Sequence, residues 1–134
     1  MAFNRVRGDK IHKTVILDSS AILMIFEFSI DLENELAGLV GAYHLVVPTA
    51  VVRELQILAT HSKTQKKAAA ALKLIEKYET IYEDAQYADD ALVQIAQRTK
   101  GFVVTNDAKV RMRLRTLGLP VIFLRGKKKL ALEE

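Results

Sequence analysis

The sequence predicts an α/β protein: a three-layer α/β/α sandwich with a central, mainly parallel five-stranded sheet. Short aliphatic runs such as "TVILD" (14–18) are typical of strands buried on both faces. Segments with helical spacing of apolar residues separate these runs, and strands separated by helices favour parallel pairing. With 134 residues, of which 50% are hydrophobic, the chain is long enough for one domain with a sizeable core.

The first half of the chain supplies two strands and four helices. The strands are "TVILD" (14–18) and "HLVVP" (44–48). Serines open the helix "SSAILMIFEF", and Asp31 opens "DLENELAGLV", in which the leucines recur at helical spacing. Thr49 is suited to cap "AVVRELQILATHS", and the Ala- and Lys-rich "KTQKKAAAALKLIEKY" is a strong helix former.

The second half alternates more simply. Three further strands are expected, "TIYE" (80–83), "FVVTND" (102–107) and "PVIFL" (120–124). The helices between them are "ADDALVQIAQRTK" and "DAKVRMRLRTLG", and the second stops at a glycine with a proline beyond it. The segment "RGKKKLALEE" is expected to be a short, partly ordered end. The expected division is an N-terminal extension at 1–13, the domain at 14–125 and a basic C-terminal tail at 126–134.

Composition excludes several classes of protein. The absence of cysteine excludes disulfides, iron–sulfur clusters and thiol nucleophiles. No apolar run approaches the roughly 20 residues of a membrane helix, and residues 1–13 lack the pattern of an export signal, so we expect a cytoplasmic protein without a membrane partner. Residues 98–134 hold ten Lys and Arg against three acids, a net +7, which leaves −3 for residues 1–97. This basic segment suits a polyanionic partner or a solvated face.

Acidic residues lie at the junctions where predicted strands end and helices begin. In an open parallel sheet these junctions share the edge at which ligands bind. The acids are Asp18, Glu54, Asp89, Asp90 and Asp107. Each has an ordinary alternative as a helix cap, a helix-dipole partner or a solvated acid. Together, carboxylates on one edge repel one another and persist most readily around a hard cation, Mg²⁺ or Mn²⁺, which could support phosphodiester hydrolysis.

Four segments resemble, in the same order, the acidic motifs of PIN-domain ribonucleases: "VILDSSAIL", "VVREL", "YADDALVQIA" and "VVTNDAKVRMRLRTLGLPVIFL". The resemblance covers about residues 14–124. It implies a PIN-like fold and a Mg²⁺/Mn²⁺-dependent endoribonuclease acting on single-stranded RNA. The residues that it makes catalytic and metal-binding are Asp18, Glu54, Asp90 and Asp107. Asp89 would be an accessory ligand, and which of the two adjacent aspartates points inward stays open.

Other residues take supporting roles in this hypothesis. By resemblance, the polar neighbours of the first and last acids are Ser19, Ser20, Thr105 and Asn106. Their hydroxyl and amide groups can orient the ligating carboxylates. The basic residues of the helix that follows the last acid are Lys109, Arg111, Arg113 and Arg115. They could guide an RNA backbone toward the metal, or they could solvate the surface.

The resemblance reaches both the PIN proteins of small-subunit ribosomal RNA processing and the VapC toxins of toxin–antitoxin pairs. It therefore implies an antitoxin or a ribosome-assembly partner, and it extends to homodimers, which PIN domains of this family often form. The alternative function is a non-catalytic PIN-fold module that binds RNA or protein in ribosome assembly and has a weak or idle metal site.

Overall fold

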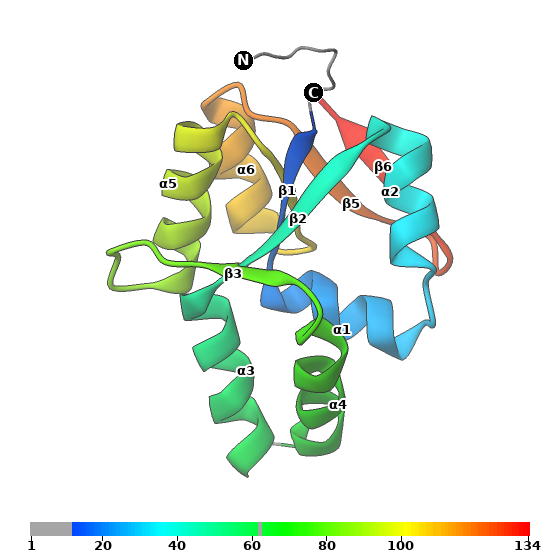
Figure 1. Ribbon diagram of the computed structural model, residues 1–134, viewed down its shortest axis with the longest axis vertical. Helices are drawn as coiled ribbons and strands as arrows, with labels where there is room; N and C mark the ends of the chain where they lie inside the picture. Colours follow the sequence, from blue (N-terminus) through cyan, green and yellow to red (C-terminus); the bar gives the residue numbers. More distant parts are fainter. Residues whose placement is uncertain (1–11, 62) are drawn as a thin grey trace, which may run out of the picture.

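A computed structural model describes residues 12–61 and 63–134 (Figure 1). Most of the expected N-terminal extension lies outside the described residues. The strands are β1 (Lys13–Leu17), β2 (Tyr43–Pro48), β3 (Glu79–Ile81), β4 (Phe102–Val104), β5 (Val121–Arg125) and β6 (Lys129–Glu133). The helices are α1 (Ser19–Glu27), α2 (Leu32–Val40), α3 (Thr49–His61), α4 (Gln65–Ile75), α5 (Ala88–Thr99) and α6 (Ala108–Thr116). None of these helices has the length and apolar composition that a membrane crossing requires.

The strands form one sheet in the order β3-β2-β1-β4-β5-β6. Neighbours from β3 to β5 pair in parallel, and β6 pairs antiparallel with β5. The chain adds β2 and β3 on one side of β1 and then crosses to add β4 and β5 on the other side. Chain order therefore reverses between β1 and β4, and open α/β sheets bind ligands at the carboxyl ends of such strands.

Helices cover both faces of the sheet, which confirms the predicted three-layer architecture. In Figure 1, α5 and α6 lie on one side of the strands and α1 and α2 on the other, while α3 and α4 extend side by side beyond the lower end of the sheet. β1 is the centre of the core: Val15 and Ile16 are fully buried, and Leu17 is 1% exposed. This buried strand holds the residue after it, Asp18, at a fixed position on the carboxyl edge.

The prediction of five strands was wrong by one, because residues 129–133 form β6 and not a tail. Gly126, with φ +70°, allows the tight turn between β5 and β6. Leu130 of β6 is buried, and Leu132 packs against the core. The run of lysines at 127–129 hid this short alternating pattern, since an edge strand of five residues gives a weak signal beside a run of charge.

Candidate active site

Asp18 lies directly after β1 and is only 4% exposed. Its Oδ1 accepts a hydrogen bond from the Ser19 backbone N–H (2.7 Å), and its Oδ2 accepts from the hydroxyls of Thr105 (2.6 Å) and Ser20 (2.9 Å). Burial raises the pKa of Asp18, these hydrogen bonds lower it, and the charge of Glu54 raises it, with a net rise. A helix-capping side chain usually accepts from the second or third helical N–H. Asp18 is the N-cap of α1 but accepts from the first helical N–H, and two further hydroxyls donate to it from Ser20 and Thr105, so capping alone does not account for this buried carboxylate.

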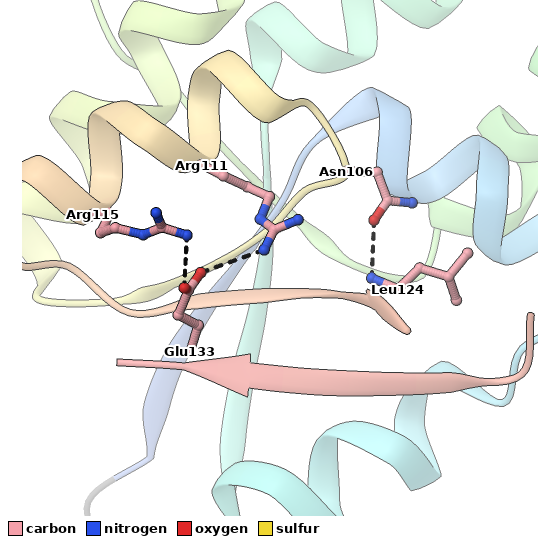
Figure 2. Close-up of polar contacts among 5 residues, drawn as sticks. All are labelled: Asn106, Arg111, Arg115, Leu124 and Glu133. Atoms are coloured by element: carbon pink, nitrogen blue, oxygen red, sulfur yellow. Dashed lines mark hydrogen bonds and ion pairs between the residues drawn. The ribbon is translucent and has the colours of Figure 1, made fainter. Parts of the chain in front are cut away.

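The turn after β4 is fastened to Asp18 and to β5 by its polar residues. Thr105 is fully buried; its hydroxyl donates to Asp18 and accepts from the Asp107 backbone N–H (3.1 Å). The Asn106 backbone N–H donates to the Ser20 hydroxyl (3.2 Å). The Asn106 side-chain oxygen accepts from the Leu124 backbone N–H of β5 (2.9 Å), as Figure 2 shows. Thr105 and Ser20 therefore contact the Asp18 carboxylate, whereas the described contact of the Asn106 side chain holds the turn against β5.

Glu54 reaches the same edge from α3. Its Oε1 accepts a hydrogen bond from the Ser19 hydroxyl (2.5 Å), across 35 positions of the sequence. Ser19 thus contacts two acids, Asp18 through its backbone N–H and Glu54 through its side chain. These contacts bring together the acids of the first two predicted motifs.

Asp107 has a helix-capping role as well as a place at the edge. It is the N-cap of α6, and its Oδ1 accepts from the backbone N–H groups of Lys109 (2.8 Å) and Val110 (3.4 Å). These are the second and third residues of the helix, the usual capping geometry. Asp107 is therefore a helix cap, as the alternative in the sequence analysis allowed, and capping uses one of its two carboxylate oxygens.

The two adjacent aspartates of α5 have different surroundings. Burial raises the pKa of Asp89 first, and the negative charges of Asp18 and Asp107 raise it further. Asp90 instead accepts a hydrogen bond from Arg113 of α6, with 3.0 Å between Oδ1 and Nη1. Consecutive helical residues point about 100° apart, so only one of the two can face the edge directly. Asp89 interacts electrostatically with Asp18 and Asp107, whereas Asp90 forms the ion pair with Arg113.

The acids lie near one another, but their side chains are not arranged as a complete metal-coordination site. Among the residues that the structure describes, no group of three or more His, Asp and Glu side chains is arranged so that it could hold an ion. Asp18, Glu54, Asp90 and Asp107 each accept hydrogen bonds from protein donors. The donor chemistry nevertheless fits Mg²⁺ or Mn²⁺, because carboxylates and hydroxyls gather here without imidazole or thiolate. Binding an ion would require some side chains to rotate.

The four basic residues predicted to bind RNA separate into two pairs. Arg111 and Arg115 form ion pairs with Glu133 of β6, at 3.4 and 2.7 Å (Figure 2). The Arg111 guanidinium also lies over the Phe123 ring, 4.1 Å from its centroid. The structure does not bring these two arginines to the acids. Lys109 and Arg113 line a hollow of about 460 Å³ along α6 that no acid lines, and Arg113 also contacts Asp90. Arg111 and Arg115 line a second hollow of about 200 Å³.

A groove beside Glu54 was missed by the sequence analysis. Its volume is about 250 Å³, and its lining residues are Ala50, Arg53, Glu54, Ile57, Gln86, Tyr87 and Ala88. The Tyr87 side chain is exposed, with 63% of the residue accessible to solvent. Only the position of Tyr87 directly before "ADD" could have drawn attention to it. The residues of α3 and of the segment before α5 meet only in the tertiary structure.

The family and the relatives agree with this fold. The sequence model of a family described as "PIN like domain" matches residues 15–127. Ribonuclease VapC9 of Archaeoglobus fulgidus is 25% identical, over 99% of this chain and 98% of its own length. Ribonuclease VapC4 of Methanocaldococcus jannaschii is 26% identical, over 85% of this chain and 92% of its own length. The solved PIN domain endonuclease Utp24 superposes with a TM-score of 0.75 at 27% identity, covering 90% of each chain. VapBC2 from Rickettsia felis, bound to a DNA fragment, shares the fold, with a TM-score of 0.56 at 16% identity over 84% of this chain and 99% of that one. Because the family match spans most of the sequence, the chain belongs to the PIN-like domain family.

Proposed function

We propose that this protein is a Mg²⁺/Mn²⁺-dependent endoribonuclease that hydrolyses single-stranded RNA in the cytoplasm. Two relatives over nearly the full chain are named ribonucleases, and a structural neighbour is named an endonuclease, which supports a nuclease function. The proposed biological role is that of a VapC-type toxin with an antitoxin partner, or of a nuclease in ribosomal RNA processing with a ribosome-assembly partner. Homodimer formation is part of the proposal.

The buried carboxylate at the carboxyl edge of β1 and β4 carries this proposal. Asp18 sits at the point where chain order reverses, and its pKa and that of Asp89 are raised partly by other acids. Burying a carboxylate near other carboxylates costs folding free energy. A serine would cap α1 without that cost. Such a cost is expected where the charge serves a ligand, here a divalent cation.

We assign the metal-binding roles to Asp18, Glu54, Asp89 and Asp107. Asp89 replaces Asp90 in the main role because it interacts electrostatically with Asp18 and Asp107, whereas Asp90 is held by Arg113. A divalent ion bound there would lower the pKa of water and neutralise charge on the phosphodiester. The hydroxyls of Ser20 and Thr105 orient the Asp18 carboxylate, and Ser19 orients Glu54.

Positively charged side chains would position the RNA backbone beside the acids. Lys109 and Arg113 are exposed, Lys109 follows Asp107 by two residues, and Arg113 contacts Asp90. Arg111 and Arg115 have only an outer role in this proposal, because both form ion pairs with Glu133, which lies opposite the first residue of β5 and so away from the carboxyl edge. Contacts to phosphate give affinity without sequence preference, so binding should weaken steeply as salt increases.

The central experiment is a cleavage assay with fluorescently labelled RNA. Purified protein is incubated with single-stranded RNA in Mg²⁺, in Mn²⁺ and in EDTA, and duplex RNA and single-stranded DNA serve as comparison substrates. We expect internal cuts in the single-stranded RNA only when metal is present. Equal cleavage in EDTA would refute metal dependence, and equal cleavage by the Asp18→Asn protein would refute the assigned site.

The second candidate function is a non-catalytic binding module. It is favoured by the absence, among the described residues, of a three-acid arrangement ready for metal and by the ion pair between Asp90 and Arg113. Thermal unfolding with and without Mn²⁺, measured alongside cleavage, separates the two functions. Stabilisation by Mn²⁺ together with RNA cuts supports the nuclease, whereas RNA binding without cuts in either metal supports the module.

The choice between toxin and processing nuclease depends on the RNA and the genome. Mapping the cut sites on total RNA would show whether cleavage concentrates in a ribosomal precursor or in another RNA. A small adjacent gene whose product binds and inhibits the nuclease would support the toxin.

A further inference from the structure

Tyr87 occupies an unusual position for an aromatic residue. It is the N-cap of α5, with an extended backbone (φ −119°, ψ 150°), and its side chain makes no capping hydrogen bond. Its carbonyl oxygen accepts the first helical bond, from the Ala91 N–H at 3.1 Å. Ser, Thr, Asp or Asn at this position would stabilise the helix. The sequence thus places an aromatic ring where a small polar side chain would fold better, and such local conflicts are expected at functional sites.

The first hydrogen bond of α5 holds the backbone of Tyr87, while its ring faces solvent. The preceding segment is anchored by the ion pair between Glu83 and Arg98 of α5, and the following residues are the first turn of α5. The ring remains 63% exposed and lines the groove beside Glu54. A rigid backbone reduces the entropy lost when a ligand packs on the ring. These are the properties of a stacking platform for an unpaired base.

The other groove residues complement a nucleotide. Gln86 supplies an amide with both hydrogen-bond donors and an acceptor, and its Nε2 lies 3.3 Å from the Tyr87 hydroxyl. Arg53 on α3 adds a positive charge next to Glu54, and Ile57, which is 51% exposed, adds apolar surface. An aromatic face, an amide and a cation match the base, its polar edge and the phosphate of a nucleotide.

We infer that this groove binds one unpaired nucleotide of the RNA next to the phosphodiester that is cut, with its base stacked on Tyr87. Glu54 lines the groove and also accepts the Ser19 hydroxyl beside Asp18, so the groove is continuous with the acidic edge. Gln86 contacts the edge of the base, and Arg53 contacts its phosphate. This inference rests on the proposed function, because it takes the cut RNA as the occupant. It also predicts a preference for single strands, since a paired base cannot stack on a protein ring.

The test measures RNA binding separately from cleavage. A short fluorescein-labelled single-stranded RNA of mixed sequence is titrated with protein in EDTA, and binding is followed by fluorescence anisotropy. The proteins are the parent, Tyr87→Ala, Tyr87→Phe and the matched control Tyr82→Ala. Tyr82 is 68% exposed in the same segment but does not line the groove. We expect Tyr87→Ala to weaken binding about tenfold, because it removes one base stack, and Tyr87→Phe and Tyr82→Ala to bind within about twofold of the parent.

A second arm locates the base in the RNA. In a series of RNAs that each carry one abasic nucleotide, the parent should lose affinity at one position beside the mapped cut, and Tyr87→Ala should show no loss at that position. Tyr87→Ser should raise the melting temperature, because serine caps α5, while it weakens RNA binding as Tyr87→Ala does. Equal binding by the parent and Tyr87→Ala overturns the inference, and so does an equal loss in the Tyr87→Ala and Tyr82→Ala proteins.

Failure of this inference is distinguishable from failure of the proposed function. If the protein cleaves RNA in Mg²⁺ but binds RNA equally well with and without the Tyr87 ring, the nuclease function is supported and the nucleotide-binding groove is refuted. If RNA binding in EDTA depends on Tyr87 but neither metal supports cleavage, the nucleotide-binding groove is supported and the nuclease function is refuted.

Discussion

Two regions of this protein concentrate charge, and they handle it in opposite ways. Between α6 and β6, Arg111 and Arg115 both form ion pairs with Glu133, so one negative charge offsets part of two positive ones. At the carboxyl edge of β1 and β4, burial raises the pKa of Asp18 and that of Asp89; the charge of Glu54 raises that of Asp18 further, and the charges of Asp18 and Asp107 raise that of Asp89 further. In the α6–β6 region opposite charges pair within the chain, whereas the carboxyl edge brings like charges together, and this edge is where we propose that a divalent cation binds.

This difference shows which charges to regard as functional. All four basic residues of α6 follow the last acid in sequence, and the sequence predicts the same two alternatives for all of them, RNA binding or a solvated surface. In the structure, Arg111 and Arg115 fasten α6 to the edge strand, and Arg113 holds Asp90. Charges that the fold already neutralises serve architecture first. Those left unbalanced in a crevice are candidates for ligand binding.

The largest effect is expected for Asp18→Asn. Cleavage should fall at least about a hundredfold, because even outer residues of a metal site cost about 10- to 100-fold when removed. The free energy of unfolding in EDTA at neutral pH should stay within about 1 kcal/mol of the parent, because relief of charge repulsion offsets the weakened hydrogen bonds. Initial cleavage rates and urea denaturation measure the two quantities. If Asp18→Asn cuts RNA as fast as the parent but is much less stable, Asp18 is a structural helix cap. The proposed difference between the carboxyl edge and the α6–β6 region is then wrong.

The next largest effect on cleavage is expected at the adjacent residues Asp89 and Asp90, whose variants can be compared with each other. Asp89→Asn should reduce cleavage about tenfold more than Asp90→Asn, because Asp89 faces the other acids and Asp90 faces Arg113. Cleavage rates at saturating Mn²⁺, together with the Mn²⁺ concentration giving half-maximal rate, measure the difference. The reverse order would mean that Arg113 releases Asp90 when metal binds.

The pH dependence of stability should distinguish the repelling acids from the paired ones. Because the folded pKa of Asp18 and that of Asp89 are raised, the folded protein binds their protons more tightly than the unfolded chain does. Their contribution to stability is full below the ordinary value of 3.8 and is lost as pH rises through the raised folded pKa. Melting temperatures from about pH 4 to 8 should therefore fall less with pH in Asp89→Asn than in the metal-free parent. Added Mn²⁺ should reverse this loss in the parent; a parent and variant with parallel profiles in EDTA would contradict the repulsion.

The smallest effect is expected at the compensated region. Glu133→Gln removes the charge that Arg111 and Arg115 share, and it should lower the free energy of unfolding by about 0.5–1 kcal/mol, since partly exposed ion pairs contribute little. Cleavage should stay within about twofold. Glu134→Gln is the matched control at the neighbouring, exposed position. A large loss of cleavage in Glu133→Gln alone would show that the α6–β6 region belongs to the active site after all.

The sequence alone determined the class of the fold, the strands β1 to β5 and the alignment of acids with strand ends. These features depend on local patterns: aliphatic runs, helical spacing and the residue type that follows each strand. It also determined that Asp18 and the residues around Thr105 belong to one neighbourhood, since parallel strands end at a common edge. Metal dependence and the RNA substrate remain proposals that these patterns support.

Only the tertiary structure decided which charges compensate one another. In the structure, residues 129–133 form β6, and Glu133 of this strand pairs with Arg111 and Arg115. Asp89 and Asp90 have different neighbours, and Arg53 and Tyr87 line the same groove. Each outcome depends on neighbours supplied by another strand or helix. The energy of a charge or an exposed ring depends on what surrounds it within a few ångströms, and the order of residues along the chain does not specify those surroundings until the sheet and its helices have packed.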